Sequence, residues 1–124
     1  MDNINNYIRQ NGYSDTILQR KMKDLGDFFT RLVKHSCVSY EYDQKMVDIL
    51  LQQTDTKVFP AALPQAKVAH KTGELNNLYD DGGIIYTEKG PYVVVIMDDD
   101  VTRRGAVAKM KKVLQATNSG LNDA

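Results

Sequence analysis

Apolar residues in the first half of the chain recur at steps of three and four, which is typical of helices that bury one face. Three helices are expected there. The first ends at Gly12, which suits a helix C-cap, and its apolar face consists of Ile4, Tyr7 and Ile8. The second begins at Ser14 or Asp15, and its buried stripe consists of Ile17, Leu18, Met22, Leu25, Phe29, Leu32 and Val33. The third spans about Tyr42 to Gln53, with an inner face of Met46, Val47, Ile49 and Leu50.

The second half changes to runs of β-branched and aromatic residues, the composition that favours strands. Residues 54–66 contain Pro60 and Pro64, show no periodicity and are expected to form a surface loop. Strands are then expected at 67–73, 82–87 and 91–97. Residues 88–90 form a three-residue hairpin loop in which Gly90 supplies a positive φ. Because the last strand is apolar on both of its faces, other elements must cover both faces of the sheet.

A closing helix is expected over 101–116, with one apolar side made of Ala106, Val107, Met110, Val113 and Leu114. The predicted fold is therefore α+β: a three-stranded antiparallel sheet with a C-terminal helix on one face and an N-terminal helical cluster on the other. The 124 residues fit one domain. Its parts are a helical segment over 1–53, the loop over 54–66, strands and closing helix over 67–117, and a frayed tail over 118–124.

Composition excludes several classes of partner and cofactor. Sixteen Lys and Arg residues balance sixteen Asp and Glu residues, so the sequence lacks the basic excess that nucleic-acid or anionic-membrane binding requires. The longest apolar run, 92–97, is far shorter than the ~20 residues that span a bilayer. Cys37 is the single cysteine, and no Cys/His cluster predicts a metal or another cofactor. The opening residues 1–6 do not resemble a secretory signal, and the cellular compartment stays open.

The candidate site consists of Lys71, Thr72 and Gly73 on the first predicted strand. An ammonium, a hydroxyl and the free amides of a strand edge suit a carboxylate, and a glycine lets a ligand approach that edge closely. Lys71 and Thr72 should face opposite sides of the sheet unless the strand bulges there. The alternatives are that Lys71 is an ordinary surface lysine and that Thr72 only favours the strand.

Other polar residues are better explained by structure than by catalysis. We expect His70 to be a packed or exposed strand histidine rather than a general base. The run of aspartates at 98–100 is interpreted as a solvated helix start rather than a metal site. His35 and Cys37 are expected to end a helix rather than to form a nucleophile pair.

Several motifs in order along the chain resemble the C-terminal part of class A β-lactamases and related penicillin-recognising serine hydrolases. The K-T-G at 71–73 precedes Asp-Gly-Gly-Ile-Ile-Tyr at 81–86, similar to the family's D-x-G-I-V-Y, and Gly-Pro-Tyr at 90–92, similar to its G-P-Y hairpin. Upstream, 18–22 resembles L-x-R-K-M, 46–53 resembles M-x-x-I-L-x-x-Q, and 60–64 resembles the proline-rich approach to the K-T-G strand. The resemblance implies recognition of a β-lactam or peptide carboxylate by Lys71, Thr72 and Gly73.

The resemblance also shows which catalytic elements the sequence lacks. In the family, the nucleophile is the serine of S-x-x-K. None of the serines has a lysine three positions later: Ser14, Ser36, Ser39 and Ser119 precede Ile17, Ser39, Tyr42 and Asn122 at that spacing. The S-D-N motif would fall at or before Met1, and no E-N-x-T-type segment follows Lys21-Met22-Lys23-Asp24. No catalytic residue set is complete, so we expect the chain by itself to be inactive as a hydrolase.

Three functions remain open at this stage. The chain is the C-terminal part of a serine hydrolase, a non-catalytic module that binds a carboxylate, or a structural module without a ligand. In the resembled family, two further strands and a helix from the N-terminal part complete the sheet, and this sequence lacks them. The uncovered edge predicts a homodimer or a strand-exchanged oligomer.

Overall fold

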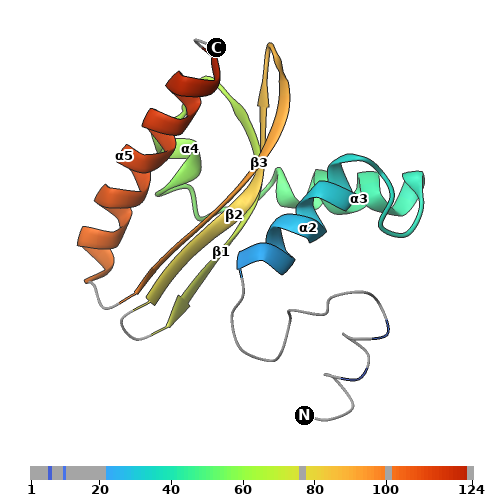
Figure 1. Cartoon of the computed structure of the whole chain (residues 1–124), viewed down its shortest axis with the longest axis horizontal. Helices are drawn as coiled ribbons and strands as arrows, with labels where there is room; N and C mark the ends of the chain where they lie inside the picture. The colour runs from blue at the N-terminus through green and yellow to red at the C-terminus, as the bar shows by residue number, and fades with distance from the viewer. Residues whose placement is uncertain (1–5, 7–9, 11–21, 76–77, 100–101, 123–124) are drawn as a thin grey trace.

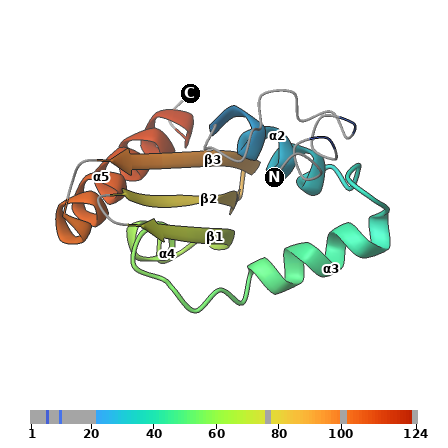
Figure 2. The same ribbon diagram turned by 90° about the horizontal axis from the view of Figure 1, so that it is seen from below.

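The computed structural model describes residues 6, 10, 22–75, 78–99 and 102–122. A sheet of three antiparallel strands, in the order β1-β2-β3, consists of β1 (Lys67–Leu75), β2 (Leu78–Thr87) and β3 (Gly90–Asp99). Helices α2 (Met22–Val33) and α3 (Tyr40–Leu50) lie on one side of it (Figures 1 and 2). The one-turn helix α4 (Phe59–Ala62) and the long helix α5 (Arg103–Asn122) lie on the other. The predicted α+β class and the helices on both faces are confirmed.

Both faces of the sheet carry apolar side chains, and each face has its own core. Toward α4 and α5, Val68, Tyr79 and Ile85 pack with Phe59 and Met110. The other core, toward α2 and α3, consists of Phe29, Leu32, Val47, Ala69 and Ile84. Neighbouring residues of a strand alternate between these cores, as the period of two in a strand requires. Each position on β1 can therefore be assigned to a side of the sheet.

Two glycines set the geometry of the hairpins. Gly90 has φ = +113°, as predicted, but it pairs with Thr87 as the first residue of β3, so the turn contains only Glu88 and Lys89. Gly83 lies opposite His70, and a Cβ there would be 2.2 Å from the Ala69 carbonyl oxygen and 2.7 Å from His70 Cα. Only a residue without a side chain lets β1 and β2 approach this closely.

The turn between α2 and α3 is stabilised by backbone groups and one buried carboxylate. His35 has φ = +56° after the end of α2, and Ser36 N–H donates to Arg31 C=O over 2.9 Å. Asp43 accepts from the N–H groups of Cys37 and Val38, at 2.7 and 2.9 Å. Desolvation would raise the pKa of Asp43, but these backbone hydrogen bonds hold it below its usual range. His35 thus follows the end of α2, whereas Cys37 lies in the turn between α2 and α3 rather than at the helix end that was expected.

Several predicted boundaries and inward positions were wrong. The predicted loop contains α4, because Val58, Phe59 and Ala62 bury apolar side chains against the sheet. The strand expected from Gly82 begins at Leu78. The third helix begins at Tyr40, after its N-cap Ser39, and ends at Leu50. The closing helix continues to Asn122 through most of the predicted tail.

Four apolar residues that were predicted to face inward are instead exposed: Met22, Leu25, Ile49 and Val113. Apolar periodicity marks a face that suits burial, but no element of the described structure covers these positions. Apart from residues 6 and 10, the predicted first helix and the start of the second, up to residue 21, lie outside the described residues.

We predict that Gly83→Ala lowers the free energy of unfolding by about 1–3 kcal/mol, since the new methyl group meets backbone atoms that cannot move independently. Gly26→Ala is the matched control, because a Cβ at that helical position contacts nothing within 4 Å. It should stabilise the protein by up to ~1 kcal/mol. Urea unfolding of both variants tests this, and equal stability of Gly83→Ala and the parent chain would contradict the close approach of the strands.

Candidate functional site

Lys71 projects from β1 on the face that carries α2 and α3. The parity of the strand places it on the same side as Ala69, whose side chain is in the α2/α3 core. Lys71 is exposed, and its Nζ donates to the Thr72 carbonyl over 2.6 Å. Its cross-strand partner is Gly82, and the next β1 residue on that face is Gly73. A Cβ at Gly82 would meet Phe29 of α2 at 3.3 Å, and one at Gly73 would meet the Asp80 carboxylate at 3.4 Å. Both glycines thus lie against other side chains, whereas the side chain of Lys71 is exposed.

Thr72 faces the opposite side of the sheet. The register from Lys67 to Leu75 has no bulge, so Lys71 and Thr72 are separated by the sheet, as the alternation of strand residues predicted. The Thr72 hydroxyl hydrogen-bonds to the carboxylate of Asp55, in the connection between α3 and α4. Asp55 also accepts from the Tyr79 hydroxyl over 3.0 Å. The hydroxyl thus anchors β1 to this connection, so its single proton is already donated.

Hydrogen bonds control the ionisation of Asp55. Desolvation pushes its pKa upward, but the Tyr79 hydroxyl, the Lys57 N–H and the Thr72 hydroxyl outweigh that effect and hold the pKa below 3.8, its ordinary value. Asp55 is therefore an ionised acceptor at neutral pH. The resulting Thr72–Asp55–Tyr79 cluster connects β1, β2 and the α3–α4 connection, and sequence reasoning missed it because only the three-dimensional fold brings these residues together.

The imidazole of His70 and the carboxylate of Asp81 form a buried pair next to the K-T-G positions. His70 Nδ1 lies 2.7 Å from Asp81 Oδ1, and the two side chains are 1% and 0% exposed. Asp81 Oδ2 accepts from the Phe59 N–H over 3.3 Å. Burial raises the pKa of Asp81, against the opposing effects of the His70 and Phe59 hydrogen bonds. His70 is packed, in agreement with one of its predicted interpretations.

The sequence contains the residues that indicate this pair, but they can be matched only when the register of the two strands is known. His70 is directly opposite Gly83, and Asp81 is the diagonal neighbour two residues away on the same face. The absent side chain at Gly83 leaves room for the imidazole to reach the carboxylate. The predicted start of the second strand at Gly82 left Asp81 outside the sheet, so the pairing was not foreseen.

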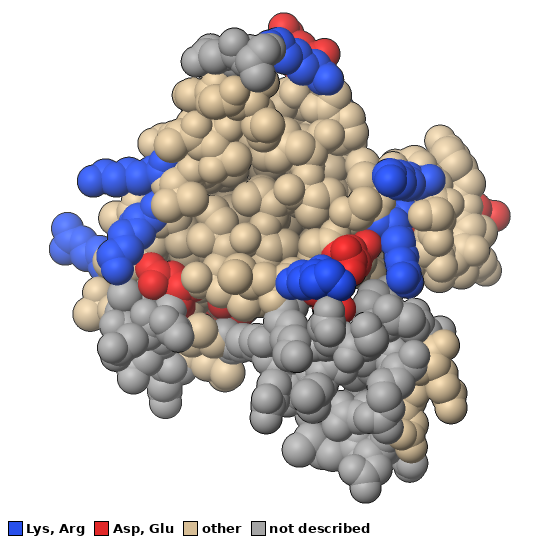
Figure 3. Space-filling view, viewed as in Figure 1, with Lys and Arg blue, Asp and Glu red and all other residues tan. Residues whose placement is uncertain are grey.

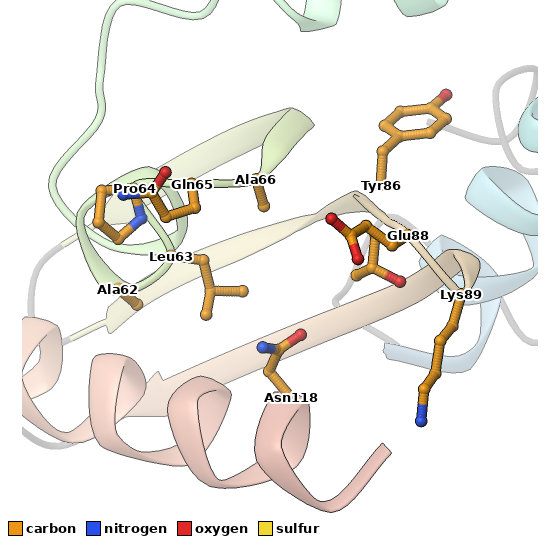
Figure 4. Close-up of a pocket in the computed structure, with 10 residues that line it drawn as sticks. Ala62, Leu63, Pro64, Gln65, Ala66, Tyr86, Glu88, Lys89 and Asn118 are labelled. Atoms are coloured by element: carbon orange, nitrogen blue, oxygen red, sulfur yellow. The ribbon is translucent and has the colours of Figure 1, made fainter. Parts of the chain in front are cut away.

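The larger of two described cavities, about 590 Å³, is not lined by the K-T-G residues (Figure 4). It lies between the α4–β1 connection, the β2–β3 hairpin and the end of α5, with Leu63, Ala66 and Asn118 among its lining residues. None of Lys71, Thr72 and Gly73 lines either described cavity.

Charged side chains surround a broad uncharged surface (Figure 3). Figure 3 has the orientation of Figure 1, in which β3 crosses the front of the sheet between α5 and α2. Residues 92–97 of β3 are apolar and all partly exposed. On its free edge β3 pairs with no other described strand. An unpaired apolar edge of this kind is a surface for association.

The remaining candidate residues do not assemble into a centre. Asp98 is at the end of β3, with its carboxylate 4.0 Å from Lys109 Nζ on α5. His35 Nε2 lies 2.9 Å from Gln44 Oε1, and its ring stacks on Tyr40. Within the described ranges, no three His, Cys, Asp or Glu side chains gather as metal ligands. No helix among the described segments has the length and apolar character to cross a bilayer.

Comparison with known proteins identifies a family for this chain. The model of a "Beta-lactamase enzyme family" matches residues 1–118. The structure of PBP-A superposes with a TM-score of 0.84 at 19% identity, over 97% of this chain and 51% of the other. The β-lactamase of Sphaerobacter thermophilus gives 0.75 at 24% identity, over 94% and 53%. The TLA-1 extended-spectrum β-lactamase gives 0.65 at 18% identity, over 77% and 40%. The chain spans about half of these structures or less. No curated protein sequence matches it.

We predict that Tyr79→Phe raises the pKa of Asp55 and lowers the free energy of unfolding at pH 7 by up to about 1 kcal/mol, the value of one partly screened hydrogen bond. Because the pKa of Asp55 is lower in the folded than in the unfolded protein, its stabilisation is present above pH 3.8 and lost as the pH falls through the folded pKa. The variant should lose less stability on acidification than the parent chain.

Carboxyl ¹³C titration of Asp55 and urea unfolding at pH 7 and pH 3 measure the two effects. Tyr92→Phe is the matched control, since its hydroxyl donates to Asn118 rather than to Asp55. An unchanged Asp55 titration in Tyr79→Phe would show that the hydroxyl does not stabilise the carboxylate.

Proposed function

The chain belongs to the β-lactamase enzyme family, and on that premise we propose that it contributes the carboxylate-recognising part of a site for β-lactams or acyl peptides. The contact residues are Lys71, Thr72 and Gly73 on β1. The observation that carries the proposal is the exposed ammonium of Lys71, which is flanked on its own face by Gly82 and Gly73. An exposed cation on an edge strand suits a carboxylate of a substrate.

The three residues have different roles in this proposal. Lys71 supplies the charge that attracts the carboxylate. Gly73 leaves the strand edge open, and the side chain nearest to a Cβ at that position would be Asp80, at 3.4 Å. Thr72 acts through the backbone and through its bond to Asp55, which holds β1 in place, because its hydroxyl proton is not free for a ligand. The ligand is thus recognised by charge and by backbone groups.

We further propose that the chain by itself does not turn over its ligand. An acyl-enzyme requires a nucleophile and a base that removes its proton, and the sequence contains no S-x-x-K. The histidine of the buried pair is no substitute, since it is on the sheet face opposite Lys71. Charge and backbone contacts alone supply binding without a covalent step.

The second candidate is a non-catalytic structural or interaction module. The open apolar edge of β3 favours it, because such an edge serves association whether or not a ligand binds. A second copy of this chain, paired through β3 or exchanging a strand, would cover the edge.

We predict that benzylpenicillin binds this chain non-covalently and that Lys71→Ala weakens binding about tenfold or more, the effect of losing one charge-assisted contact. Lys45→Ala is the matched control, because that exposed lysine on α3 contacts Glu41 and the Tyr42 ring of its own helix and is not on the sheet. NMR titration gives the affinities, and intact-mass spectrometry together with nitrocefin hydrolysis tests for chemistry.

Equal binding by Lys71→Ala and the parent chain would refute the site. A penicilloyl adduct on the parent chain would instead refute the claim of inactivity, since it requires a nucleophile that the sequence motifs do not reveal. Absence of any binding, with the fold intact, would favour the structural module.

We predict a dimer for the second candidate. Size-exclusion chromatography with light scattering at micromolar concentration should give twice the chain mass of 14.0 kDa, with outward amides of β3 protected from hydrogen exchange. On dilution, the dimer mass and the protection of the β3 amides from exchange should be lost together. A monomer of 14.0 kDa throughout would count against pairing through β3.

A further inference from the structure

A second cavity, about 340 Å³, lies along the outer edge of the first half of β1, under the connection that leads from α3 to α4. Figure 2 shows this connection passing beneath β1 on its way to α4. Leu51, Pro60 and Val68 provide apolar walls. We call this cavity the β1 groove. It is separate from the larger cavity of Figure 4 except for Ala66, which lines both.

His70 gives the β1 groove a polar interior group. The residue lines the groove although its side chain is 1% exposed, so the imidazole is part of the floor. Its Nδ1 is bonded to Asp81, whereas Nε2 has no hydrogen-bond partner among the described residues. Nε2 is not among the fully buried unpaired atoms of the described chain. Nε2 therefore keeps a small accessible area, and the β1 groove is the described open space that His70 lines.

The polar groups at the rim are hydrogen-bond donors. Lys67 contributes an exposed ammonium and Thr56 an exposed hydroxyl. Gln53 Oε1 accepts from the backbone N–H groups of Thr54 and Asp55, so the side-chain NH₂ of Gln53 is directed away from these two groups. No acidic side chain lines the groove. A surround of donors without a competing carboxylate selects an anion.

From this arrangement we propose that the β1 groove is a binding site for a small carboxylate with an apolar body, in which His70 Nε2 donates to the ligand from the floor and Lys67 attracts it at the rim. With Nδ1–H held by Asp81, donation from Nε2 requires the imidazolium form. The bound state is then an imidazolium between the carboxylates of Asp81 and the ligand. When a ligand binds to neutral His70, the imidazole takes up one proton from the solvent.

Charged groups of both signs lie near His70. The carboxylates are those of Asp81 on β2 and, farther away, Asp55 on the α3–α4 connection, and the ammonium groups are those of Lys67 on β1 and of Lys57, which is close to Asp55. The hydroxyl of Tyr79 on β2 donates its hydrogen bond to Asp55. The site is independent of the K-T-G proposal, because Lys71 lines no part of this groove and faces α2 and α3.

The test is a titration of the ¹⁵N-labelled 124-residue chain with benzoate, followed through the ring nitrogens of both histidines. The second histidine, His35, is the internal control, since it lies in the α2–α3 turn and bonds Gln44. Benzoate should convert His70 Nε2 to its protonated signal and leave His35 unchanged. Benzyl alcohol, which has the same ring without the charge, should bind at least tenfold more weakly.

Variants separate this site from the others. Lys67→Gln should weaken benzoate binding severalfold, and His70→Gln should weaken it at least tenfold, whereas Lys45→Ala and His35→Gln should not change it. His70→Gln leaves Asp81 without its partner and can unfold the chain, in which case Lys67→Gln and the ring-nitrogen signal of the parent chain decide. An unshifted His70 signal, equal binding of benzyl alcohol, or benzoate affinity that depends on Lys71 rather than Lys67 would overturn the proposal.

Discussion

The position of β1 depends on the carboxylate of Asp81, which is fully buried in the middle of the sheet. A carboxylate in such a place is costly unless its oxygens are hydrogen-bonded. His70 bonds one oxygen from β1, and the backbone of Phe59 bonds the other from α4. One buried group thus connects two strands and the connection that covers them. Gly83 makes this possible, since the strands approach so closely there that no side chain fits.

The two sides of β1 differ in how its residues around the K-T-G positions are held. Thr72 and His70 face the α4 side, where Asp55 and Asp81 fix them. Lys71 faces the α2/α3 side and is exposed. The alternation of a strand therefore separates the anchoring residues from the exposed Lys71, for which we propose recognition of the ligand. This division explains how a chain that spans about half of its structural relatives keeps the K-T-G edge in an ordered position.

Much of the fold was predictable from local pattern, and much of the site was not. The run of β-branched residues at 92–97 identified β3, and Gly90 identified the hairpin through its positive φ. Periodicity could not distinguish Val47, which is buried, from Ile49, which is exposed, because the difference depends on which elements cover α3. The two prolines suggested a loop where Phe59 makes a buried turn. The His70–Asp81 pair required the strand register, which composition does not supply.

The central claim is that the exposed ammonium of Lys71 holds a carboxylate while no group of this chain attacks the ligand. A crystal structure of the chain soaked with benzylpenicillin tests it most directly. The account predicts an intact β-lactam ring with the ligand carboxylate within hydrogen-bond distance of Lys71 Nζ. An opened ring joined to a side chain of the protein, or a carboxylate bound elsewhere with Lys71 Nζ free, would contradict it.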